Sequence, residues 1–136
     1  MGFEELQTGV VISSPFLWAR EAAAGETEGR KRRPVAVALR LARPGGDAVV
    51  LLPTTTQPPA RERNAVEVPE TEKQRAGLDT SVRCWIMLDE FNTDIIGKSY
   101  YLEPEPPLGV FSRAFFAPVA RRFVGHVKAA RKVDRR

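Results

Sequence analysis

The residues best suited to chemistry form a basic run, Arg30, Lys31, Arg32 and Arg33, that leads directly into a predicted strand. Four consecutive cations repel one another unless water or an anion screens them. Because Arg33 precedes Pro34, an extended backbone is favoured there, and its planar guanidinium suits a phosphate. The run predicts an anion site at the start of a strand. A solvated loop before a strand is the simpler alternative.

Polar residues at two further strand ends extend this candidate site. The turn at 43–47 makes the strands before and after it antiparallel, so Arg33 at the start of one lies beside Thr54 at the end of the other. Each charge-assisted hydrogen bond from such a pair to a phosphate is worth about 1.5–3 kcal/mol. Asp89 and Glu90 close a third strand, although such pairs are also common in turns without chemical roles.

Other kinds of site find little support in the composition. Cys84 and His126 are the only cysteine and the only histidine, so the sequence predicts no transition-metal site and no internal disulfide. We expect Cys84 to be a small buried residue opening a strand, and His126 to be a partly buried packing residue. No phosphate-binding glycine loop is present, and no activated serine accompanies the histidine. No cofactor is predicted.

The distribution of charge separates the basic run from the rest of the chain. The net charge is +4, and the last ten residues account for all of it with five cations and one aspartate. We therefore expect a flexible basic tail at about 129–136 and a body whose charges balance, with one local basic cluster at 30–33. The first nine residues resemble no signal peptide, and no membrane span is predicted, so a cytoplasmic protein is expected.

The hydrophobic pattern predicts one domain over residues 1–136, mainly β, with a C-terminal helix packed across a small twisted sheet or half-open barrel. Residues 16–29 form a long loop with a turn or two of helix at 18–24. Phe16 and Trp18 at its start are either core anchors or apolar contacts for a partner. The predicted strands are 10–12, broken by Ser13–Pro15; 34–42, with alternate residues on one apolar face; 48–52, ended by Pro53; 65–68; 84–88; and a weaker one at 99–102. The predicted helices are 69–76 and about 118–131.

Several short segments, taken in order, resemble the PemK/MazF family of toxins from bacterial toxin-antitoxin modules. They are R-P-V-A-V at 33–37, L-L-P-T at 51–54, V-E-V at 66–68 and W-I-M-L-D-E at 85–90, and Trp18 and E-G-R-K at 28–31 agree with them. The likeness covers roughly residues 8–128, with a lengthened first loop. It implies a half-open antiparallel barrel of the CcdB/PemK/MazF type, a homodimer, and metal-independent cleavage of single-stranded RNA.

The same resemblance assigns roles to individual residues. Arg33 would neutralise the charge that develops when a ribose 2′-hydroxyl attacks the adjacent phosphate, and Thr54 would hydrogen-bond a phosphoryl oxygen. Arg30, Lys31, Arg32 and Thr55 would bind RNA or its phosphates. An antitoxin segment would occupy the dimer groove near Phe16 and Trp18.

The sequence departs from the family at two positions near the proposed site. Members of the family often have glutamine at the position that matches Glu90. They also often have a second cation near the position that matches Asn92. We therefore consider auxiliary roles for Asp89 and Glu90, with Glu90 as a base.

Two other classes of function stay open. One is a non-catalytic module that binds RNA or protein, and the other is a structural or dimerisation domain. The family fold also serves a gyrase-poisoning toxin that uses a C-terminal Trp-Gly-Ile, whereas this chain ends Val133-Asp134-Arg135-Arg136, which argues against that mode.

Overall fold

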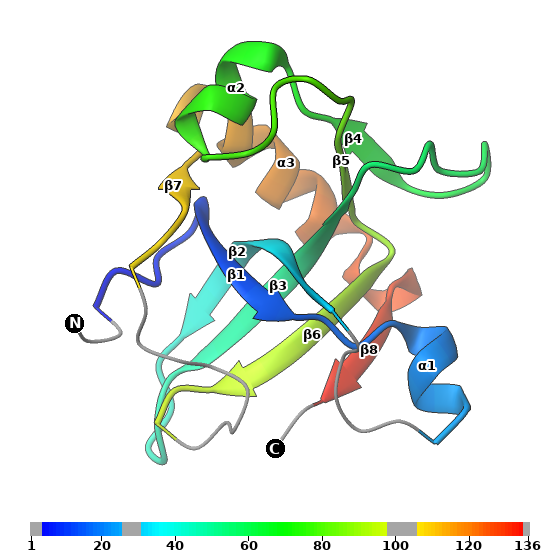
Figure 1. Ribbon diagram of the computed structural model, residues 1–136. Helices are drawn as coiled ribbons and strands as arrows, with labels where there is room; N and C mark the ends of the chain where they lie inside the picture. The colour runs from blue at the N-terminus through cyan, green and yellow to red at the C-terminus, as the bar shows by residue number, and fades with distance from the viewer. Residues whose placement is uncertain (1–3, 26–30, 98–105, 135–136) are drawn as a thin grey trace.

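The protein is a curled, mainly antiparallel sheet with a helix across one face, as Figure 1 shows. The computed structural model describes residues 4–25, 31–97 and 106–134. The predicted class, mainly β with a C-terminal helix, is confirmed. The described strands are β1 (Val10–Pro15), β2 (Arg32–Leu41), β3 (Ala48–Thr55), β4 (Ala65–Glu67), β5 (Trp85–Met87), β6 (Glu90–Ile95), β7 (Gly109–Val110) and β8 (Arg131–Asp134). The helices are α1 (Ala19–Ala23), α2 (Glu70–Arg75), α3 (Arg113–Gly125) and the 3₁₀ turn η1 (Val127–Ala129).

The central hairpin of β2 and β3 carries the rest of the sheet. Strand β1 and then β7 pair on one side of it, and β3 pairs with β6 and with β5 on the other. The predicted turn at 43–47 and the predicted strand at 65–68 are confirmed by this arrangement. The pairing also places the start of β2 beside the end of β3, where the candidate site was expected.

Two strands are longer than predicted. Strand β1 continues through Ser13–Pro15, because these residues pair with the start of β2. Strand β3 continues past Pro53 to Thr55. Its pairing with β6 ends at Leu51 and its pairing with β5 begins at Thr54, so Pro53 stands where the strand changes neighbours. A proline, which lacks an N–H to donate, is tolerated at such a break in the ladder.

Strand β2 contains an irregularity that overturns its predicted alternation. The register with β3 shifts between Val37 and Leu39, which leaves Ala38 as an extra residue. Val37 packs on one side of the sheet, whereas Ala38 and Leu39 both pack on the other. Leu39 therefore does not share a face with Val37, and Arg40 turns toward the N-terminal segment, where it bonds the Leu6 carbonyl.

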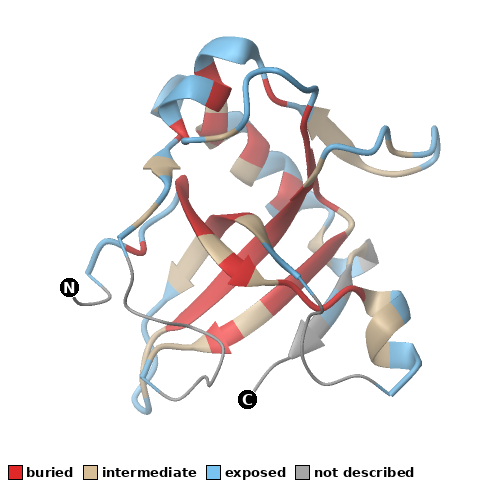
Figure 2. Ribbon diagram, in the orientation of Figure 1, coloured by how far each residue is buried: buried red, intermediate tan, exposed pale blue. Residues whose placement is uncertain are grey.

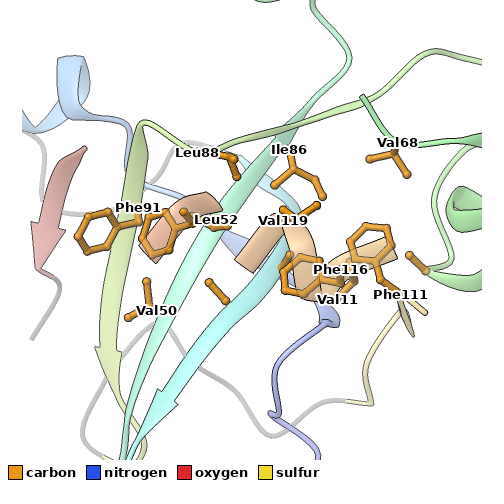
Figure 3. Close-up of a cluster of buried hydrophobic side chains, with 14 of the residues drawn as sticks. Val11, Val50, Leu52, Val68, Ile86, Leu88, Phe91, Phe111, Phe116 and Val119 are labelled. Carbon is orange, nitrogen blue, oxygen red and sulfur yellow. The ribbon is translucent and has the colours of Figure 1, made fainter. Parts of the chain in front are cut away.

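Apolar side chains cover the sheet on both faces, unlike the single buried face predicted for β2. Buried residues fill the centres of β2, β3 and β6 in Figure 2. Figure 3 shows the larger cluster, in which Phe116 and Val119 of α3 pack with Val11 and Leu52 from the sheet. The second cluster includes Leu6, Phe16 and Trp18, so the loop after β1 closes the opposite face.

The C-terminal region differs most from the prediction. Helix α3 begins at Arg113, because Ser112 caps it by accepting a hydrogen bond from the Phe115 amide at 3.2 Å, and Pro118 lies inside it. The helix ends at Gly125 and does not reach residue 131. Instead of a flexible tail, residues 131–134 form β8, parallel to β6.

The polar residues 89–92 were expected at the end of a strand, but Glu90–Ile95 is itself strand β6. The predicted helix at 69–76 is confirmed as α2. The strand predicted at 99–102 lies outside the described residues. Among the helices that are described, none has the length and apolar character needed to cross a bilayer.

Candidate anion site at the edge of β2 and β3

The pairing of β2 with β3 brings Arg33 and Thr54 to one pocket, as the sequence predicted. Val35 of β2 pairs with Pro53 of β3 in an antiparallel register. The residues just before Val35 therefore lie beside the residues just after Pro53. The pocket has a volume of about 330 Å³. It is lined by Lys31, Arg32, Arg33, Pro34, Thr54, Thr55, Thr56, Leu78, Asp79, Val82 and Cys84. The lining thus combines three cations and three hydroxyl groups with several apolar side chains and one carboxylate.

Thr54 is less available to a ligand than expected. Its side chain is buried, and its hydroxyl donates a hydrogen bond to the Pro34 carbonyl at 2.7 Å. Burial raises the pKa of the neighbouring Cys84 thiol, and a hydrogen bond with Thr54 opposes that rise. By contrast, Thr55 is half-buried and its hydroxyl accepts from the Gln57 amide at 3.1 Å, which leaves its proton free to donate. Thr55 is therefore the better placed hydroxyl for a phosphate oxygen.

Arg33 is held by an aromatic ring. Its guanidinium carbon lies 5.2 Å from the centre of the Trp18 ring. Burial lowers the pKa of Arg33, while the charge of Glu21 raises it and that of Arg20 lowers it. No ion pair joins Arg33 to a carboxylate within the described part of the chain, so its charge is left for an anion.

The loop that carries Trp18 is fastened to β6 by two buried side chains. The Asn92 amide accepts from the Leu17 N–H at 2.9 Å and donates to the Leu17 carbonyl at 2.8 Å. A Glu90 oxygen accepts from the Ala19 amide at 2.7 Å. Strand β6 thereby fixes the backbone on both sides of Trp18, and with it the ring beside Arg33.

Arg63, which the sequence did not single out, binds both acidic residues of the 85–90 segment. It forms a forked pair with Asp89, one bond being 2.9 Å long, and reaches Glu90 at 3.0 Å. Hydrogen bonding with Asp89 raises the pKa of Arg63, although burial opposes it. Burial would raise the pKa of Asp89, but Arg63 and the Asn64 amide outweigh burial, so that pKa is lowered.

This network corrects the auxiliary role considered for Asp89 and Glu90. Both Glu90 oxygens are engaged, one by Arg63 and the other by Ala19, and neither acidic residue lines the pocket of Arg33. Asn92 is also fully buried. Neither departure from the family pattern places a side chain in the pocket of Arg33. Glu90 and Asn92 instead position the loop that carries Trp18.

The remaining predicted residues fall into three groups. Lys31 and Arg32 line the pocket, and Arg32 also bonds the Ser13 carbonyl at 2.8 Å, whereas Arg30 lies outside the described residues. Phe16 and Trp18 are buried at 1% and 7% exposure, which fits core anchors rather than surface contacts. His126 was predicted to be partly buried but is exposed, because it follows the end of α3 and bonds the Arg122 carbonyl at 2.9 Å.

Asp79 is a second residue that the sequence did not reveal. It is exposed at the edge of the pocket, where bonds from the hydroxyl and amide of Ser81 lower its pKa. The Asp-x-Ser spacing at 79–81 is typical of a turn, so the sequence alone gave no sign that this turn faces Arg33.

In the described part of the chain, no three histidine, cysteine, aspartate or glutamate side chains are grouped as a metal ion would require. Comparisons with protein-family models, with curated proteins and with solved structures find no match. The functional assignment therefore depends on the chemistry of the site.

Proposed function

We propose that this protein is an endoribonuclease toxin of a type II toxin-antitoxin system, with a fold of the CcdB/PemK/MazF type, that cleaves single-stranded RNA without a metal. The observation that carries the proposal is Arg33, a cation without a carboxylate partner in the described structure, in a pocket with three threonines. An unpaired guanidinium with hydroxyl donors beside it suits the nonbridging oxygens of a phosphodiester.

In the proposed reaction the ribose 2′-oxygen attacks the adjacent phosphorus. A new O2′–P bond forms as the P–O5′ bond breaks, which gives a 2′,3′-cyclic phosphate and a free 5′-hydroxyl. The 2′-hydroxyl gives up its proton to water, and the departing 5′-oxygen takes one from water. Arg33 stabilises the charge on the phosphoryl oxygens, and Thr55, or Thr54 once released from Pro34, donates to one of them.

The proposal extends to partners. Lys31 and Arg32 at the rim gather the RNA backbone and contribute affinity. From the family resemblance we also expect a homodimer that acts in the bacterial cytoplasm. We expect an antitoxin that blocks the site.

Expression in bacteria tests the proposal with Arg33→Ala and a matched control, Arg43→Ala. Arg43 is an exposed arginine in the turn at the other end of the β2–β3 hairpin. Wild type and R43A should arrest growth and leave cleaved transcripts ending in cyclic phosphate. R33A should lose about 10²–10³-fold in the rate of RNA cleavage by the purified protein, as when one oxyanion donor is removed. Equal activity of wild type and R33A would refute the proposal.

A non-catalytic RNA-binding module is the second candidate. It is favoured by the engaged hydroxyl of Thr54 and by the commitment of Glu90 to Arg63 and Ala19, which leaves Asp79 as the carboxylate on the pocket wall. Salt-dependent RNA binding with no product detectable by mass spectrometry would select this function. Failure to bind any RNA oligonucleotide at any salt concentration would instead select a structural domain.

A further inference from the structure

Arg33 also borders two hollows on the side that faces Trp18. One has a volume of about 390 Å³ and the other about 180 Å³. Trp18, Arg20 and Arg33 line both of them. The larger hollow shares Arg33 and Thr55 with the pocket described above, so the two lie on either side of one short ridge.

Two hydrogen-bond donors at these hollows lack acceptors. The Nε of Arg33 and the Nε1 of Trp18 are buried and have no partner among the described residues. The indole N–H is the only polar group of Trp18, and that side chain is 7% exposed. Buried donors are nearly always paired, so two such groups in residues that line the same hollows call for an acceptor.

The charge around the hollows favours an anionic acceptor. The guanidinium carbon of Arg20 lies 5.5 Å from the centre of the Trp18 ring, and Arg20 is exposed. Lys31 lines the smaller hollow, where Glu21 is the carboxylate present, and Glu21 already accepts from the Trp18 amide at 3.1 Å. Among the described residues that line the smaller hollow, three cations thus accompany one acidic group.

We propose that the hollow between Trp18, Arg20 and Arg33, here called the tryptophan subsite, binds a second phosphate of the RNA, next to the one held at Arg33 and Thr55. This inference rests on the proposed function, because it assumes a phosphodiester at Arg33. The ridge of Arg33 and Thr55 is shared by the larger hollow and the pocket described above, so one continuous RNA strand passes from one to the other. The ligand is therefore an oligonucleotide with at least two phosphates.

Binding of three short probes tests the tryptophan subsite. The probes are a dinucleoside monophosphate with a 2′-deoxy sugar, which cannot be cleaved, and the same molecule with an added 5′-phosphate or 3′-phosphate. Isothermal titration should show that one added phosphate tightens binding by about tenfold or more, the strength expected of a charge-assisted hydrogen bond. The end that gives this gain shows the direction of the strand.

Variants locate the added phosphate. Arg20→Ala should lose most of the gain while binding the dinucleoside monophosphate as wild type does. Trp18→Phe, which lacks the indole N–H, should also lose most of the gain, and Arg43→Ala should keep it. On a longer RNA, R20A should reduce the slope of log K against log salt by about 0.7, the value for one lost phosphate contact on a single strand. Retention of the full gain in both R20A and W18F would overturn the subsite.

The outcomes separate this inference from the proposed function. If no terminal phosphate improves binding while RNA is still cleaved, the subsite is wrong and the nuclease stands. If the gain depends on Arg20 but RNA is not cleaved, the subsite stands and the nuclease is wrong. If none of the three probes binds, both are wrong. Circular dichroism of W18F, which keeps an aromatic ring in the core, verifies its fold.

Discussion

Arg33 and Arg63 line the same hollow, but they are held in opposite ways. Arg63 donates to two carboxylates, whereas Arg33 lies against an indole ring, with its Nε unpaired in the described structure. A cation that is already paired with two carboxylates has little charge left for a ligand. One held by packing alone keeps its charge for an incoming anion. We therefore expect Arg33 to be the arginine that binds a ligand and Arg63 to be the one that holds the structure.

Glu90 connects the two arginines. One of its oxygens accepts from Arg63, and the other accepts from the Ala19 amide next to Trp18. Arg63 thus helps to fix the loop whose ring packs on Arg33. Arg63 therefore supports the position of the ring beside Arg33 through the Glu90 carboxylate.

The largest expected effect comes from Asn92→Ala. The variant leaves the buried N–H and carbonyl of Leu17 without partners, which should lower the free energy of unfolding by about 3 kcal/mol. Urea denaturation measures the change. The exposed amide Gln74 on α2 gives a control, because Q74A should leave stability nearly unchanged. A loss below about 1 kcal/mol in N92A would show that β6 does not hold this loop.

Arg63→Ala comes next and tests the comparison directly. It leaves Asp89 and Glu90 partly buried without their cation, and should cost about 2 kcal/mol of stability by urea denaturation. Arg33→Ala should cost less than about 1 kcal/mol, because no ion pair is broken. If R33A destabilises the protein more than R63A does, the division between binding and structural arginines is wrong.

A smaller effect is expected in the pH dependence of stability. The pKa of Asp89 is lowered by Arg63, so its contribution is fully present above the ordinary aspartate pKa of about 3.9 and is lost as pH falls through the folded-state value. The difference in stability between wild type and R63A should therefore shrink between about pH 5 and pH 2. Urea midpoints measured across this range would contradict the assignment if the difference stayed constant.

The smallest effect is expected at Arg83, which also lies over a tryptophan, 4.8 Å from the centre of Trp85. Arg83 is exposed and paired with Glu67 at 2.7 Å. Water screens such a pair, so Arg83→Ala should leave the urea midpoint and RNA binding unchanged. Loss of RNA affinity in R83A comparable to that in R33A would show that any arginine near an indole contributes equally.

The local features of the fold could be predicted from the sequence, and the distant pairings could not. The β2–β3 turn, α2 and the meeting of Arg33 with Thr54 follow from neighbouring residues. Pairing of β6 with β8 joins residues about forty apart, and nothing in the polar run Asp89–Asn92 indicates a strand with a parallel neighbour. The contact of Arg63 with Asp89 also depends on how β4 and β5 pair.

The candidate site was predictable in its cations but not in its hydrogen bonds. Pro34 marked Arg33, while the choice between Thr54 and Thr55 depends on a carbonyl and an amide that sequence patterns do not place. The structural role of Glu90 was hidden for the same reason, because its partners come from two loops.

The irregularity at Ala38 has a consequence at the level of the coding sequence. Loss of the single codon for this residue would remove the extra residue, so the pairing of β2 with β3 would run without a shift and the later residues of β2 would keep their faces. Leu39 would stay in the cluster under α3, and Arg40 would stay on the other face beside Asp47, to which it is bonded at 2.8 Å. Mutational scans that include deletions should therefore find residue 38 more tolerant of removal than Val50 of β3, because loss of Val50 would turn the neighbouring residues of that strand to the opposite face.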